Sequence, residues 1–123
     1  MTLMKALMSD HAGGPDSLVL REISEPVPGP KEVRIVVKAC GINYPDALII
    51  EDKYQFKPPR PFSPGSEVSG VVEAVGEGVT DFKVGDRVLG ATGNNGGMAE
   101  KVINGVNGRH VAVRSPGSWS DIF

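Results

Sequence analysis

The side chains that most often carry out chemistry are scarce in this 123-residue sequence. Cys40 is the single cysteine, which excludes a disulfide within the chain and a zinc knuckle made of cysteines. The two histidines, His11 and His110, stand in no spacing typical of metal ligands, and we expect them to be exposed or structural. The spacing of the other polar residues predicts neither a catalytic triad nor a pair of catalytic carboxylates. These residue types by themselves therefore predict no reaction.

Glycine-rich phosphate loops are also missing from the sequence. Residues 76–78 (GEG) begin a Gly-x-Gly-x-x-Gly pattern, but Asp81 occupies the position of the last glycine. No Walker-type loop occurs, and no helix-length amphipathic segment stands between two strands as a βαβ unit requires. The net charge of −2 does not predict the basic surface that nucleic acid needs. We therefore expect neither a dinucleotide site of the usual kind nor nucleic-acid binding.

Composition favours a small globular domain built mainly from strands. Hydrophobic residues make up 40% of the chain, and a chain of this length can bury one modest core. The 16 glycines and 10 prolines interrupt helices and mark turns. We see no signal peptide and no apolar run long enough to cross a bilayer, so we expect a cytoplasmic location without membrane contact.

The pattern along the chain predicts short strands joined by tight turns. A short helix is predicted over residues 43–50, because Pro45 suits a first helical turn and good helix formers follow it. Turns are expected at residues 11–15 and 94–97, and Gly70 predicts a bulge or a bend. Together these elements predict a small, mostly antiparallel barrel. The predicted strands are residues 2–8, 18–23, 32–39, 66–75, 84–89 (after a turn at 85–86), 98–103 and 110–113.

Four short motifs in this order resemble one protein family. They are ACGINYPD (39–46), PGSEVSG (64–70), VEAVG (72–76) and VGDRV (84–88). Their order and spacing are similar to the N-terminal, GroES-like domain of the medium-chain dehydrogenase/reductase superfamily, and in detail to its quinone oxidoreductase branch. The resemblance implies a partly open barrel with a few short helices, which forms one wall of an active-site cleft. In such enzymes a separate Rossmann domain forms the other wall.

The resemblance also bears on zinc. Zinc alcohol dehydrogenases of this superfamily carry a cysteine ligand shortly before an aspartate and a histidine ligand in a Pro-Gly-His-Glu string. Here these two positions are Asn43 and Ser66. Zinc prefers thiolate, imidazole and carboxylate ligands, so we expect no zinc. Cys40 is expected to be a small buried side chain near the end of a strand.

Without zinc, hydrogen-bond donors must polarise a substrate carbonyl. The resemblance places Asn43 and Tyr44 at the cleft wall and Tyr54 just beyond the short helix. The Asn43 amide can donate to a carbonyl oxygen or orient the nicotinamide edge of NADPH, and the phenols can donate or stack on a flat ring. A structural role remains open for each of them, because asparagine also suits a helix start and tyrosines often pack on barrel rims.

Three acidic positions have structural interpretations. Asp46 is either a cleft acid or, as we favour, a structural partner of an arginine or a backbone amide. Glu67 follows the lost ligand position and is expected to contact residues behind the cleft. Asp86 and Arg87 are most simply a turn followed by a surface ion pair.

We therefore predict a GroES-like domain over residues 1–114 and a tail over 115–123 that is truncated before the cofactor domain. The resemblance implies the substrate side of an NADPH-dependent enzyme that reduces a quinone or another activated carbonyl or alkene. We expect the chain to be inactive alone, because the dinucleotide-binding half is missing. The alternative is a standalone barrel that acts as a binding or assembly module. Apolar surface left uncovered near the tail would then promote self-association.

Overall fold

The computed structural model describes residues 2–93, 95–106 and 113–114. This part of the chain contains seven strands, one α-helix and one 3-10 helix, which confirms the mainly β fold with short helices. Within it, neither helix has the length or apolar character that a membrane-spanning helix needs. In chain order the elements are β1 (Leu3–Met8), η1 (Pro15–Ser17), β2 (Val19–Ser24), β3 (Glu32–Gly41), α1 (Tyr44–Ile50), β4 (Glu67–Val75), β5 (Arg87–Ala91), β6 (Lys101–Gly105) and β7 (Val113–Arg114).

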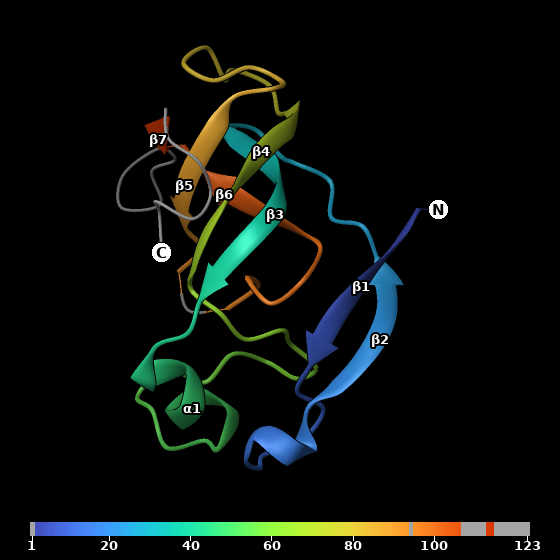
Figure 1. Cartoon of the computed structure of the whole chain (residues 1–123), viewed down its shortest axis with the longest axis vertical. Helices are drawn as coiled ribbons and strands as arrows, with labels where there is room; N and C mark the ends of the chain where they lie inside the picture. Colours follow the sequence, from blue (N-terminus) through green and yellow to red (C-terminus); the bar gives the residue numbers. More distant parts are fainter. Residues whose placement is uncertain (1, 94, 107–112, 115–123) are drawn as a thin grey trace.

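Five strands form one antiparallel sheet in the order β6-β3-β4-β5-β7 (Figure 1). The two central strands alternate in sequence as a half-buried strand should, so every second side chain enters the core. Val33 and Ile35 of β3 and Val72 of β4 are fully buried there. The remaining core members are Val68, Val88 and Val102.

Two bulges interrupt the pairing of β3 with β4. On β3 the extra residue is Lys38, which follows the pair formed by Val37 and Gly70. On β4 the extra residue is Glu73. The predicted irregularity at Gly70 is therefore present, but the additional residue lies on the opposite strand. A bulge re-aims the side chain it carries. The bulge at Glu73 accompanies a contact between its carboxylate and Arg34 of β3.

The predicted strand over residues 98–103 is wrong in its bounds. Residues 98–100 bond to β1, where the Leu7 N–H donates to the Met98 carbonyl and the Glu100 N–H donates to the Lys5 carbonyl. The Glu100 carbonyl already accepts a hydrogen bond from the Val37 N–H of β3 at 2.8 Å, and β6 begins at the next residue, Lys101. The segment changes partners in its middle, because it crosses from β1 to the main sheet. Of the strand predicted over residues 110–113, only Val113 lies within the described residues. Of the turn predicted at residues 94–97, only Asn94 lies outside them.

Strands β1 and β2 form a separate antiparallel hairpin beside the main sheet (Figure 1). Strand β1 buries Met4, Ala6 and Met8 on one face. Strand β2 is exposed along almost its whole length, and Leu20 is 65% exposed. Its alternation of residue types therefore does not correspond to a buried face in this chain.

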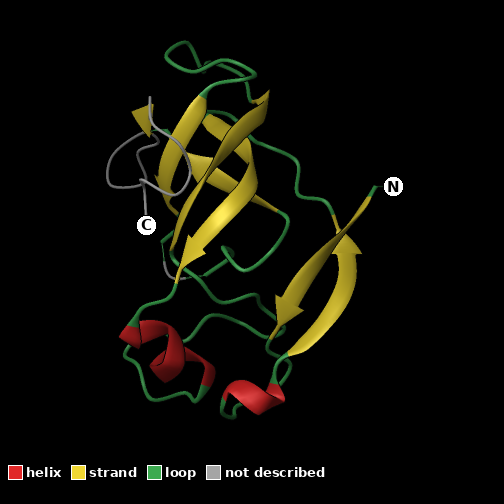
Figure 2. Cartoon of the chain, in the orientation of Figure 1, coloured by secondary structure: helices red, strands yellow, loops and turns green. Residues whose placement is uncertain are grey.

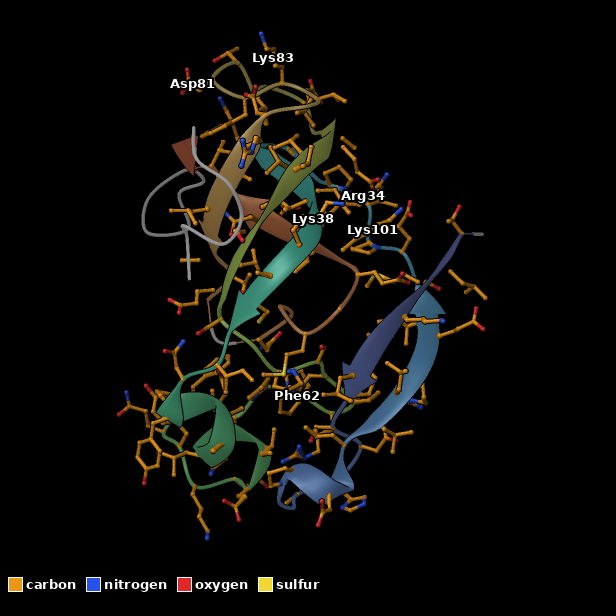
Figure 3. The ribbon with its side chains drawn as sticks, in the orientation of Figure 1. Arg34, Lys38, Phe62, Asp81, Lys83 and Lys101 are labelled. Atoms are coloured by element: carbon orange, nitrogen blue, oxygen red, sulfur yellow. The ribbon has the colours of Figure 1, made fainter. Side chains whose placement is uncertain are left out.

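A four-member charged network joins the chain just after β2 to the main sheet. The Arg34 guanidinium lies 3.1 Å from Glu25 and 2.6 Å from Glu73, and the Lys101 ammonium contacts the same two carboxylates. Figure 3 shows Arg34 and Lys101 on the side of the sheet that faces the hairpin. All four side chains are less than one third exposed, so solvent screens these ion pairs less than ordinary surface pairs.

Candidate active site

Strand β3 leads directly into α1, the helix drawn below the sheet in Figure 2. Asn43 is the N-cap residue, and its backbone N–H donates to Oδ2 of Asp46 at 2.9 Å. The Asp46 N–H in turn donates to the Asn43 carbonyl at 3.0 Å. Asp46 is thus held by a backbone amide, which confirms the structural role that its sequence position suggested.

Asp46 is almost completely buried, with 3% of its surface exposed. While Oδ2 accepts the Asn43 hydrogen bond, Oδ1 has no hydrogen-bond partner among the described residues. Burial raises the pKa of this carboxyl, the hydrogen bond from Asn43 lowers it, and the negative charge of Glu67 raises it again, with a net upward shift. A buried carboxyl oxygen that has no hydrogen-bond partner is uncommon in protein structures and requires an explanation.

Cys40 lies at the end of β3, close to the same two acids. Its thiol lies near the backbone at Gly65 and Gly97, and the position near a strand end is as predicted, but the side chain is half-buried and not buried as expected. The carboxylate of Glu67 lies over Gly41. Burial raises the pKa of the Cys40 thiol to about 11, and the charges of Asp46 and Glu67 add to the increase. This electronegative setting is the opposite of one that activates a thiol.

The three residues expected at a cleft differ in their surroundings. Asn43 is exposed at the helix start, and Tyr44 is 76% exposed. Tyr54 is half-buried and packs against the cluster formed by Ile49, Ile50 and Phe62. Asn43 and Tyr44 are therefore accessible to a ligand, whereas Tyr54 also contributes to a small hydrophobic core.

Arg60 is a structural residue that the sequence patterns did not indicate. Its guanidinium donates to the Ser9 hydroxyl at 2.9 Å, the Ile50 carbonyl at 3.1 Å and the Asp52 carboxylate at 2.8 Å. It also lies 5.1 Å from the centre of the Phe62 ring, within the range of a cation–π contact. Arg60 thus fixes the end of α1 against the loop that follows β1. Only its position between two prolines, in PRP, marked it as unusual.

Comparison with known proteins decides the family. Residues 29–121 match the family model of the alcohol dehydrogenase GroES-like domain. This chain belongs to that family. It is 40% identical over 116 residues to a quinone oxidoreductase of Lama guanicoe, covering 94% of this chain and 34% of the relative. It is 44% identical over 102 residues to a quinone oxidoreductase of Homo sapiens, covering 82% of this chain and 31% of the relative.

A solved structure gives the same result in three dimensions. The chain superposes on a quinone oxidoreductase of Pseudomonas syringae with a TM-score of 0.84 and 36% identity, covering 94% of this chain and 34% of that one. The resemblance to the quinone oxidoreductase branch is confirmed. The chain spans about a third of the length of the curated relatives it matches.

Asn43 and Ser66 are the two positions at which the sequence resemblance leads us to expect the zinc ligands of other branches. Asn43 presents an amide at the helix start, and Ser66 presents a hydroxyl just before β4. Neither is a usual zinc ligand. Among the residues that the structure describes, no group of three or more histidines, cysteines or acids is placed to hold a metal ion.

Two hollows lie near the site. The larger, of about 500 Å³, separates the β1–β2 hairpin from the sheet, and its one charged lining residue among those described, Lys101, already pairs with Glu25 and Glu73. The smaller, of about 250 Å³, lies against α1 and is lined by Asp46 and apolar side chains. Of these two hollows, only the smaller is lined by an acid, and the unpartnered Oδ1 atom of that acid is itself buried.

The Cys40 thiol is expected to react slowly with alkylating reagents. A pKa near 11 in place of 9.0 lowers the thiolate fraction at pH 8 about a hundredfold. A more basic thiolate is also a stronger nucleophile, which offsets part of the loss in thiolate fraction. The net rate with iodoacetamide should therefore be at least about tenfold below that of the unfolded chain. Rates measured from pH 7 to 10, with and without urea, test this. A rate in the folded chain that levels off by pH 9 would contradict the prediction.

Proposed function

We propose that this chain is the substrate-side domain of an NADPH-dependent quinone oxidoreductase-like enzyme, which reduces a quinone or another activated carbonyl or alkene. The proposal is supported by the relatives named quinone oxidoreductases, which match 82–94% of the chain. The observation that carries it is the exposure of Asn43 at the start of α1, where the sequence resemblance leads us to expect a zinc ligand in other branches.

In this proposal Asn43 takes over the task of polarising the substrate carbonyl. Its NH₂ group donates a hydrogen bond to the oxygen that gains negative charge during reduction. The exposed phenol of Tyr44 stacks on or donates to the flat ring beside it, and the half-buried Tyr54 limits the far side. The alternative interpretation of Asn43, as a helix cap alone, predicts no loss of substrate binding when its donor is removed.

The described residues offer groups suited to the nicotinamide end of NADPH but not to its diphosphate. The cofactor supplies the hydride when it is bound. Asn43 and Tyr44 offer polar groups suited to the nicotinamide edge. Within the described residues no Gly-x-Gly-x-x-Gly sequence lies between a strand and a following helix, so they form no cradle of the usual kind for the diphosphate.

Asn43→Asp is the variant that separates a catalytic amide from a helix cap. Aspartate caps a helix as well as asparagine does, but it has no NH₂ donor and carries a negative charge. We expect the affinity for duroquinone to fall about tenfold, the size of one hydrogen bond to a polar ligand. Titrations followed by NMR measure this, and duroquinone is chosen because its fully methylated ring resists attack by thiols.

The thermal midpoint serves as the control in this experiment. It should change by no more than a few degrees, since the cap is retained. An unchanged affinity for duroquinone would reduce Asn43 to a structural residue and remove the main support for the proposed cleft.

The 123-residue chain by itself is expected to show no turnover of NADPH with a quinone. The described residues lack a cradle for the cofactor diphosphate, so NADPH cannot be held in a reactive geometry. Absorbance at 340 nm, recorded with duroquinone in excess, measures this directly. Sustained NADPH oxidation by the purified chain, in the absence of any other protein, would overturn the expectation.

A further inference from the structure

The exposed carboxylate of Glu67 lies beside the segment that leads into α1. Glu67 is the first residue of β4, and it pairs with Gly41, the last residue of β3. Because Gly41 has no side chain, the Glu67 carboxylate lies over it, in the space that a β-carbon of Gly41 would fill. Asn43, the exposed N-cap of α1, follows two residues later. Glu67 therefore brings a carboxylate close to the residue that the proposed function places against the substrate.

The negative charge of Glu67 is not neutralised by a neighbour. Among the described residues, no cationic side chain forms an ion pair with Glu67 or with Asp46. Burial makes the largest contribution to the raised pKa values of Asp46 and Cys40, and the charge of Glu67 adds to both. Asp46 in turn accepts the hydrogen bond of the Asn43 N–H at 2.9 Å. The start of α1 therefore lies in a negative electrostatic potential, to which Glu67 contributes from the surface.

Two exposed side chains with large apolar surfaces flank Asn43 in the chain. Ile42 is 80% exposed, and Tyr44 is 76% exposed. Their apolar surface favours a molecule that is itself apolar, because covering such surface removes it from water. The Asn43 amide can donate to a carbonyl oxygen, which needs no charge to accept. An uncharged ring with a carbonyl group therefore suits these three residues, whereas an anion would also have to approach Glu67.

We propose that Glu67 determines the charge of the molecules that bind at the start of α1, so that uncharged quinones are accepted as substrates and anionic quinones are rejected. The identity of the ring rests on the proposed function, whereas the rejection of anions depends on the charge of Glu67 alone. Repulsion between two like charges falls with distance and with salt concentration. A purely structural role for Glu67, as a cover over Gly41, predicts no dependence on the charge of the ligand.

The first test compares two trimethylbenzoquinones that differ in charge. One carries a propanoate chain at its fourth ring position, and the other carries the corresponding primary amide, so the ring and the chain length are matched. Titrations of the 123-residue chain followed by NMR give the two dissociation constants. We expect the anion to bind about three- to fivefold more weakly at low salt, as for exposed pairs of charges. The difference should disappear at about 1 M salt, where charges are screened within about 3 Å.

The second test needs no quinone and follows the alkylation of the Cys40 thiol. Iodoacetamide is uncharged and iodoacetate is anionic, and both alkylate the same sulfur atom with loss of iodide. The ratio of their rates cancels the thiolate fraction, so the raised pKa of Cys40 does not affect it. We expect the preference for iodoacetamide over iodoacetate to be about three- to fivefold stronger in the folded chain than in the chain unfolded by urea.

Three variants assign the effect to Glu67. Glu67→Gln removes the charge and keeps the shape, and Glu67→Lys reverses the charge. Glu77→Gln makes the first change at another exposed glutamate, just beyond the opposite end of β4 and roughly 30 Å away along that strand. We expect Glu67→Gln to abolish most of the discrimination in both tests, Glu67→Lys to favour the anions, and Glu77→Gln to have no effect. Circular dichroism establishes that each variant is folded.

The outcomes separate this inference from the proposed function. If the uncharged quinone binds and the anionic quinone binds equally well, the proposed function stands and the role of Glu67 is refuted. If the uncharged quinone does not bind, the proposed function loses its support, and the alkylation ratios still decide whether Glu67 excludes anions. Discrimination that persists in Glu67→Gln, or that does not respond to salt, would also overturn the inference.

Discussion

Replacing Gly70 by alanine is expected to destabilise the domain by about 3–4 kcal/mol, a large part of the roughly 5–15 kcal/mol that stabilises a typical domain. A β-carbon at this position would lie 2.1 Å from the Val36 carbonyl oxygen and 2.5 Å from Cγ2 of Ile35. Both neighbours belong to β3, an inner strand of the sheet between β6 and β4, and Ile35 is fully buried. The strands would have to separate beside the bulge at Lys38. Urea denaturation measures the loss as a lower midpoint.

Gly14→Ala is the matched control for this substitution. A β-carbon on Gly14 would have nothing within 4 Å, and its backbone angles of −73° and −173° suit any residue. We expect its free energy of unfolding to stay within about 0.5 kcal/mol of the original or to rise slightly, because alanine restricts the unfolded chain. If both glycine variants unfolded at the same urea concentration, the close approach of β3 and β4 would not be a determinant of stability.

Local alternation of residue types was sufficient to predict the central strands. Val33 and Ile35 stand two residues apart in β3, and both enter the core as that spacing requires. The same rule failed for residues 98–103, because alternation reports that a segment is extended but not which strand it pairs with. At Glu100, whose N–H bonds to β1 and whose carbonyl bonds to β3, the chain changes partners, and that change depends on residues about 65–95 positions away.

The candidate site was predictable to the same limited degree. Asn43 and Asp46 have residue types and a spacing that specify the start of a helix, and the structure contains that cap. The contacts of Arg60 were not predictable, because Ser9, one of its partners, lies 51 residues earlier in the chain. The free oxygen of Asp46 was equally inaccessible to sequence reasoning, since it results from the packing of several distant segments around α1.

Arg34→Met is expected to destabilise the domain by about 3 kcal/mol at pH 7, because it leaves two largely buried carboxylates with Lys101 alone. Burial alone would raise the pKa of Glu73, but hydrogen bonds from Lys101 and Arg34 outweigh it and lower that pKa from 4.5. A carboxyl group with a lowered pKa stabilises the fold at pH values above its ordinary pKa of 4.5. This stabilisation is lost as the pH falls through the pKa of the folded state. The difference in the free energy of unfolding between the original chain and Arg34→Met should therefore be largest near neutral pH and shrink in acid.

Arg21→Met provides the comparison, because Arg21 forms an equally short ion pair with Asp10 in which both side chains are more than one third exposed. A surface pair of this kind contributes at most about 1 kcal/mol. Adding Glu73→Gln to Arg34→Met should restore part of the lost stability, since it removes one of the uncompensated carboxylates. Urea denaturation of the four proteins between pH 3.5 and 7 tests all three statements. Equal losses for Arg34→Met and Arg21→Met, or a loss for Arg34→Met that does not shrink in acid, would show that the network contributes no more than an ordinary surface ion pair.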